Sequence, residues 1–175
     1  MLDRAQSEIG ACFPADYREF MRWRNGGEPD PSFFVRRQRG ERWVGWVQAF
    51  APITSSRIDS LNLRGQQELL QRYADEAVPV PRGCIAVGYT GPGDSILLFT
   101  SGRRRGQVWL KVWDDVSSDP KIVAKPSDGL YKLAGSFNAF LKNLCTEEEA
   151  ERRLARAQAP RPQKKRSRER RAPIR

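Results

Sequence analysis

The sequence predicts an α+β fold, in which a twisted, mainly antiparallel sheet of about five to six strands is flanked by N-terminal, middle and C-terminal helices. Apolar residues recur at helical spacing near both ends of the chain and in one middle segment. Between residues 84 and 113 they alternate instead at strand spacing, with turn residues in between. The 175 residues are enough for one domain with an appendage.

The first 27 residues predict two helices separated by a short break. The first helix has its apolar residues on one face and ends at Gly10. Pro14 suits the first turn of the second helix, because its missing N–H has no partner there. Asn25-Gly26-Gly27 then permits the positive φ that a helix end requires. The inward-facing residues of the two helices are Leu2, Ala5, Ile9, Tyr17, Phe20 and Met21.

The middle of the chain predicts two strands and a helix. Residues 33–37 and 42–50 have strand composition, and the second segment carries apolar residues on both of its faces. Residues 66–77 predict an amphipathic helix, which Pro79 and Pro81 end.

A β-rich segment follows. Residues 84–90 and 95–100 predict a hairpin, because the residues Gly91–Asp94 between them favour a tight turn. Residues 107–113 and 121–125 are the further strands that we expect from the alternation of apolar residues.

The C-terminal segment predicts a core helix, a charged helical extension and a tail. The helix after Ser136 has a core stripe. Thr146 and Glu149 form a capping box that begins the charged extension, residues 146–158. Residues 159–175 contain no core-forming residues, which predicts a disordered basic tail. The stripe consists of Phe137, Phe140, Leu141 and Leu144, and the expected ion pairs of the extension are Glu148–Arg152 and Glu149–Arg153.

Several short motifs follow one another in a fixed order along residues 1–145. They are the Phe-Pro step with its DYREF helix, the Asn-Gly-Gly corner, Pro81-Arg82-Gly83, Gly93-Asp94, Gly106-Gln107-Val108, Trp113-Asp114 and the LAGSF segment ending at Phe137. This order resembles the SUKH superfamily, the Smi/Knr-like domains. The resemblance implies one such domain over residues 1–145, with residues 28–80 matching least. The motif residues to which it assigns a structural role are Pro14, Tyr17, Phe20, Asn25, Gly26, Gly27, Gly93, Asp94, Gly106, Phe137, Phe140 and Leu141.

The charge is distributed unevenly along the chain. Residues 151–175 hold eleven Lys and Arg against two Asp and Glu, which leaves 20 basic and 19 acidic residues in the first 150. The net charge of +10 is therefore a property of the tail. The tail cations expected to bind a polyanion such as nucleic acid are Lys164, Lys165, Arg166, Arg168, Arg170 and Arg171. The alternative is a solvating tail with no partner.

The composition also limits the chemistry. The sequence contains no histidine, which excludes Ser-His-Asp and Cys-His nucleophile pairs and every His-ligated metal site. The three cysteines are far apart and show no zinc spacing. We therefore expect no metal and no cofactor. The start of the chain lacks a signal-peptide core and no apolar run is long enough to span a bilayer, so we expect a cytoplasmic protein that contacts no membrane.

Two groups of residues are candidates for binding a partner protein. The first is an aromatic platform on the sheet, since Trp anchors many interfaces; the alternative is that these rings cover the sheet under a helix. The second is a cationic hairpin tip, which is alternatively a solvated turn that protects a sheet edge. The residues are Trp43, Trp46, Trp109 and Trp113 for the platform, and Arg103, Arg104 and Arg105 for the tip.

The carboxylates Asp94, Asp114 and Asp115 are candidates for Mg²⁺ binding or acid–base chemistry. Turn formation is the favoured interpretation of Asp94, because Asp is a common turn residue and no nucleophile with an adjacent base is recognisable. An enzyme is not expected.

The resemblance implies a bacterial immunity protein that binds a cognate polymorphic toxin and occludes it. Family members that face nuclease toxins are often acidic, whereas this domain is near neutral, so an acidic toxin surface is the better expectation. The alternative is a Smi/Knr-like regulatory scaffold whose basic tail associates with nucleic acid or another polyanion. The oligomeric state does not follow from the sequence.

Overall fold

The computed structural model describes residues 1–38, 41–54, 61–75, 80–116 and 124–158. The strands β1 to β6 form one antiparallel sheet in sequence order. The α+β prediction is confirmed. The helices are α1 (Leu2–Ile9), α2 (Ala15–Trp23), α3 (Leu63–Asp75), α4 (Phe137–Asn143) and α5 (Glu147–Gln158). The strands are β1 (Phe33–Gln38), β2 (Glu41–Phe50), β3 (Cys84–Thr90), β4 (Ser95–Phe99), β5 (Val108–Lys111) and β6 (Leu130–Ala134).

The last strand lies elsewhere than expected. The strand predicted at 121–125 falls mostly outside the described residues, and Ala124 and Lys125 do not belong to a strand. β6 (Leu130–Ala134) pairs with β5 in its place. Its residues Leu130–Ala134 mix charged and apolar side chains and are only partly buried, which gives a weak strand pattern.

The core lies on one face of the sheet, beneath α1, α2 and α4. Tyr17 contacts the rings of Phe13 and Phe137, with centroid distances of 5.4 and 4.9 Å. Phe50 from β2 contacts Phe137 at 5.5 Å. The motif residues of α2 and α4 therefore pack in the core. Tyr17, Phe137 and Phe140 are buried, and Phe20 and Leu141 are partly buried.

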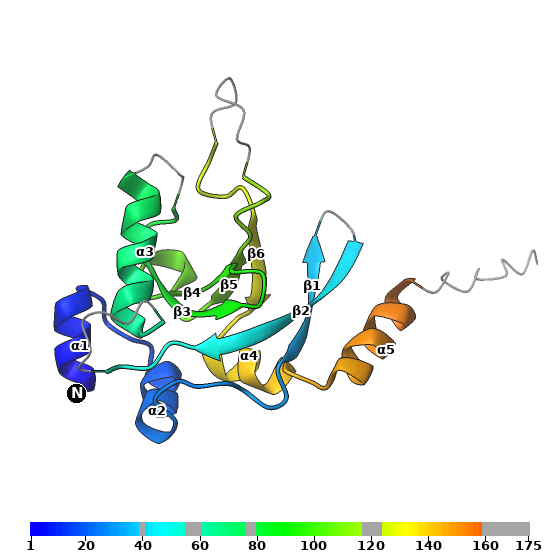
Figure 1. Cartoon of the computed structure of the whole chain (residues 1–175), viewed down its shortest axis with the longest axis horizontal. Helices are drawn as coiled ribbons and strands as arrows, with labels where there is room; N and C mark the ends of the chain where they lie inside the picture. The colour runs from blue at the N-terminus through cyan, green and yellow to red at the C-terminus, as the bar shows by residue number, and fades with distance from the viewer. Residues whose placement is uncertain (39–40, 55–60, 76–79, 117–123, 159–175) are drawn as a thin grey trace, which may run out of the picture.

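The other face of the sheet is covered by α3. Leu70 packs against Ala86 and Leu97. The register between β3 and β4 shifts after Ala86, and the amide of Gln67 hydrogen-bonds both backbone groups of Ala86, at 2.9 and 3.3 Å. α3 is thereby joined to the irregular part of the sheet. Figure 1 shows α3 beside β3.

The Asn-Gly-Gly corner connects α2 to the end of β2. Asn25 has φ of 50°, and its side-chain amide donates to and accepts from the backbone of Ile53, both at 3.0 Å. Gly27 forms an antiparallel bridge with Phe50. Pro14 occupies the N-cap position of α2, one residue before the helix. The turn glycines Gly93 and Gly106 both have positive φ.

Helix α5 lies at the end of the molecule opposite α1, beside the β1–β2 hairpin (Figure 1). Ala150 is fully buried, and α5 contacts both β1 and β2. The expected capping bond from Glu149 N to Thr146 Oγ1 is present at 3.4 Å, as is the Arg153–Glu149 ion pair at 3.0 Å. Arg152 pairs with Glu149 at 3.3 Å instead of Glu148, whose backbone carbonyl accepts from Arg152 Nε.

Candidate partner-binding surfaces

Trp43 belongs to a stack of side chains at the β1–β2 hairpin, in which it is the exposed member. Arg36 is the register partner of Trp43, and its guanidinium lies 6.0 Å from the Trp43 ring and 4.8 Å from the ring of Tyr131 on β6. The Tyr131 hydroxyl donates to Asp115 Oδ2 at 2.6 Å. Trp43 is 49% exposed. We call these residues, Arg36, Trp43 and Tyr131, the hairpin stack.

Trp46 points away from the hairpin stack, because residues three apart on a strand face opposite sides of a sheet. Its ring lies 6.4 Å from Phe33, its register partner. A Cβ at Gly91 would overlap the indole, so Gly91 leaves the space that Trp46 occupies. Trp46 is 39% exposed.

Trp109 and Trp113 are partly buried on the α3 side of the sheet. The ring of Trp113 stacks on Tyr73 of α3 at 4.2 Å. Trp109 donates from Nε1 to Gln107 at 3.1 Å and lies 6.1 Å from Phe99. The four tryptophans therefore do not form one platform: Trp43 and Trp46 are exposed on opposite faces, and the other two pack against neighbours.

The three arginines of the hairpin tip have three different environments. Arg105 donates to the backbone carbonyls of Thr100 and Cys12, so it connects the hairpin to the segment between α1 and α2. Arg104, at the end of the 3-10 turn Gly102–Arg104, lies 4.6 Å from the Trp109 ring. Arg103 is exposed. The tip thus offers one free cation and one cation placed over an aromatic ring.

Asp94 helps to form the turn in which the sequence places it. Its N–H donates to Thr90 Oγ1 at 3.1 Å, and its Oδ1 accepts from Trp113 N at 3.4 Å. Burial raises the pKa of Asp94. The negative charges of Asp114 and Asp115 raise it further, and the positive charge of Arg36 lowers it. Within the described ranges, no three His, Cys, Asp or Glu side chains come together as a metal site.

Lys111 is a buried cation that sequence reasoning missed. It is fully buried, its Nζ donates to the Asp128 carbonyl at 2.6 Å, and it lies 5.4 Å from the Trp113 ring. Burial lowers the pKa of Lys111. The clue is its place in the alternation of residues 107–113, where it shares a face with Trp109 and Trp113.

The partly buried thiol of Cys84 makes the free energy of unfolding fall at alkaline pH. Its Sγ donates to the Pro81 carbonyl, and burial raises its pKa to about 12. Because the unfolded thiol ionises near pH 9 while the folded thiol stays neutral, stability is complete below that pH and declines as pH rises from there toward 12. Between pH 8 and 10 the wild type should lose about 1.4 kcal/mol more than Cys84→Ala. Urea unfolding at both pH values measures this difference.

The matched control for this prediction is Cys12→Ala, because Cys12 is an exposed free thiol. It should lose as much stability as the wild type between pH 8 and 10. Equal losses in all three proteins would contradict the assignment to Cys84.

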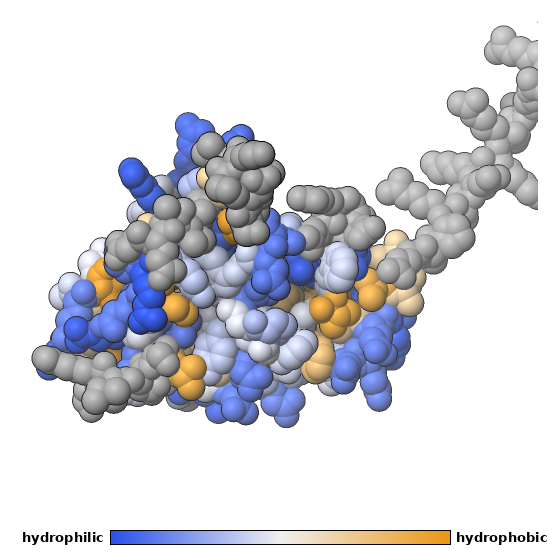
Figure 2. Space-filling model, turned by 45° about the horizontal axis from the view of Figure 1, so that its top comes forward, coloured by the Kyte–Doolittle hydropathy of each residue, from blue (hydrophilic) through white to orange (hydrophobic). Residues whose placement is uncertain are grey.

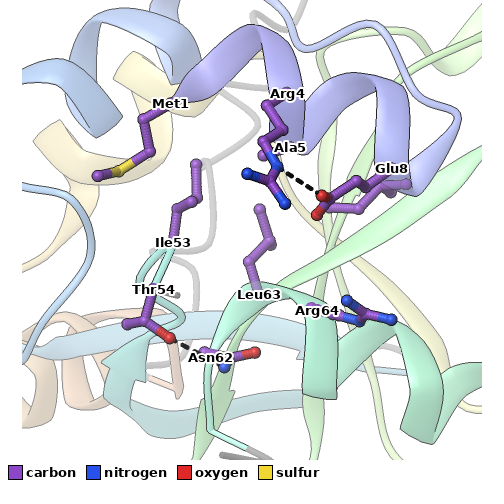
Figure 3. A pocket seen from close by; sticks show the side chains of 10 residues that line it. Met1, Arg4, Ala5, Glu8, Ile53, Thr54, Asn62, Leu63 and Arg64 are labelled. Atoms are coloured by element: carbon purple, nitrogen blue, oxygen red, sulfur yellow. Dashed lines mark hydrogen bonds and ion pairs between the residues drawn. The ribbon is translucent and has the colours of Figure 1, made fainter. Parts of the chain in front are cut away.

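A hollow of about 370 Å³ separates α1 from the start of α3 (Figure 3). Ile53 and Leu63 give it an apolar floor. Glu8, the carboxylate among its described lining residues, accepts from Arg4 at 2.8 Å, and Thr54 accepts from Asn62 at 3.0 Å. Arg64, which also lines the hollow, pairs with Glu68 of α3 at 3.0 Å. These polar side chains are therefore engaged within the protein, which suits a structural role for the hollow.

Two further predictions concern the cations of the tail and the contact with membranes. The predicted tail cations lie in residues 159–175, outside the described residues. None of the helices in the described part of the chain has the length and apolar character that crossing a bilayer requires. On the face drawn in Figure 2, hydrophobic residues form small patches separated by hydrophilic ones.

Comparison with known proteins agrees with the motif order. The family model described as the SMI1 / KNR4 family (SUKH-1) matches residues 1–143. Neither a curated protein nor a solved structure matches the chain. The match covers α1 to α4 and the whole sheet. The chain belongs to the SMI1/KNR4 (SUKH-1) family.

Proposed function

We propose that this chain is a non-catalytic binding protein that neutralises a cognate protein toxin by covering the toxin's functional surface. Membership of the SMI1/KNR4 (SUKH-1) family supports a role in binding. The observation that carries the proposal is the hairpin stack, in which the Arg36 guanidinium lies 6.0 Å from the exposed Trp43 ring and 4.8 Å from the Tyr131 ring.

The composition and order of the hairpin stack suit an interface anchor. Trp, Tyr and Arg are the residues most enriched at binding hot spots. Arg36 contacts two rings, and Tyr131 is held by Asp115, so these side chains lose little conformational freedom on binding. Two of its three residues, Arg36 and Trp43, lie in β1 and β2, within the residues 28–80 that match the superfamily motifs least. Residues that differ between family members can distinguish one toxin from another, so this segment suits a specificity determinant.

Titration of an isolated toxin tests this proposal. The probe is the purified toxin whose gene lies beside the gene for this chain, and the readout is its activity as the chain is added. Trp43→Ala should weaken the complex by at least about 30-fold, the size expected for a hot-spot residue. Trp23→Ala is the matched control, because Trp23 is 82% exposed at the end of α2. Equal inhibition by Trp43→Ala and the wild type would contradict the placement of the interface.

For residues 159–175 we retain the proposal that follows from their composition. A polyanion binds there through Lys164, Lys165 and the neighbouring arginines. The domain-level proposal does not depend on it, because the hairpin stack lies in β1, β2 and β6.

A further inference from the structure

Two adjoining hollows form a groove on the other side of the sheet from the hairpin stack. One, of about 900 Å³, lies between α3, the segment between α1 and α2, and the start of β3. The other, of about 480 Å³, lies beneath the 3-10 turn Gly102–Arg104. The two hollows share four lining residues, so they are continuous. The shared residues are Pro81, Arg82, Ser101 and Pro126. We call them together the cationic groove.

The charges of the cationic groove all have one sign. Arg82, Arg103, Arg104 and Arg105 line it, and the described lining residues include no Asp or Glu. Arg105 is engaged with the carbonyls of Thr100 and Cys12. Arg82, Arg103 and Arg104 form no ion pair with any carboxylate in the described part of the chain. A domain whose net charge is near zero thus concentrates unpaired cations in one hollow.

The guanidinium of Arg104 is preorganised for binding an anionic ligand. It lies over Trp109 and Phe99, at 4.6 and 5.3 Å from the ring centroids, and is partly buried. An arginine that rests on rings loses less conformational freedom when it pairs with a carboxylate, and the nearby apolar surface strengthens that pair. Arg103 and Arg82 are exposed beside it.

We infer that the cationic groove binds an extended acidic segment of a partner protein. The 900 Å³ part also has apolar lining, from Ile9, Leu70, Ala74 and Val80, which suits the aliphatic side chains of a peptide. Nucleic acid fits less well, because base stacking needs exposed rings. Phe99 is 4% exposed, and Arg104 lies over Trp109. This inference goes beyond the proposed function, since the groove and the hairpin stack lie on opposite faces of the sheet and are tested separately.

The test uses the full chain and a fluorescent ten-residue peptide rich in Glu and Asp. Fluorescence polarisation compares the wild type with the triple variant Arg82→Gln, Arg103→Gln, Arg104→Gln. The groove variant should bind at least about tenfold more weakly, and wild-type binding should weaken between 50 and 200 mM salt. The matched control is Arg22→Gln, Arg24→Gln, Arg156→Gln, which removes the same charge from exposed positions elsewhere and should bind like the wild type.

Cys12 gives a second readout that locates the peptide. Cys12 and Cys84 both line the groove, but only Cys12 is exposed, and burial raises the pKa of Cys84. Cys145 is buried elsewhere. Bound peptide should slow alkylation of Cys12 by iodoacetamide severalfold, which mass spectrometry measures. A peptide held only by residues 159–175 would leave that rate unchanged.

Three results would overturn the inference: equal peptide binding by the groove variant and the wild type, an unchanged Cys12 alkylation rate at saturating peptide, or stronger protection of Cys12 by a ten-nucleotide single-stranded RNA than by the peptide. None of them bears on toxin inhibition through Trp43.

Discussion

Phe137→Ala should lower the free energy of unfolding by about 3–5 kcal/mol. Phe137 is fully buried, and its ring contacts Tyr17, Phe20 and Phe50 at centroid distances of 4.9, 5.0 and 5.5 Å. These contacts join α4 to α2 and to β2, so truncation leaves a cavity where three elements meet. Domains are stable by only about 5–15 kcal/mol, and the loss is therefore a large share of the total.

Urea unfolding followed by circular dichroism measures this loss. Trp23→Ala is the control, because it also removes a large ring but from an 82% exposed position, and its cost should stay within about 0.5 kcal/mol. A loss below about 1 kcal/mol for Phe137→Ala would mean that the aromatic cluster does not hold these elements together.

Gly26→Ala should cost at least about 3 kcal/mol, for two physical reasons that add. The first is its φ of 86°, which L-residues with a Cβ rarely adopt. The second is space: a Cβ would lie 2.7 Å from both Phe50 O and Pro52 N, and backbone atoms cannot rotate away. Relief requires the corner to separate from β2, which breaks the bonds between Asn25 and Ile53.

Gly10→Ala separates the two contributions to the Gly26 effect. Gly10 has φ of 70°, and nothing lies within 4 Å of a Cβ built there. This variant should therefore show the conformational cost alone, about 1–2 kcal/mol. Chemical denaturation of both variants makes the comparison, and equal costs would contradict the role of close packing at the corner.

Local patterns predicted the fold well wherever they were strong. The hairpin around Gly91–Asp94 and the helix after Ser136 were predicted from turn chemistry and helical spacing, and the structure confirms both. β6 was missed because Tyr131 and Lys132 interrupt its apolar pattern, and because this strand is held by pairing with β5. Pairing between distant segments leaves no periodic signal.

The geometry of the candidate binding surfaces was predictable only in part. Residue type singles out Trp43, but its contact with Arg36 joins β1 and β2, and Tyr131 lies almost a hundred residues later in the chain. The same limit applies to the cationic groove, where Arg82 and Arg104 belong to different segments. Arg105 stays a predicted partner-binding residue, but no sequence pattern indicated that its guanidinium donates to the backbone carbonyl of Cys12. Only the folded chain separates an arginine that fixes a loop from one that faces solvent.

Stoichiometry tests most directly whether this protein acts by binding alone. When the wild-type chain is titrated into the purified toxin proposed as its partner, well above the dissociation constant, inhibition should increase linearly and end at a fixed whole-number ratio. Both proteins should stay intact and be recovered together by gel filtration. Loss of toxin activity at a small fraction of that ratio, continuing with time, would show turnover and contradict the account.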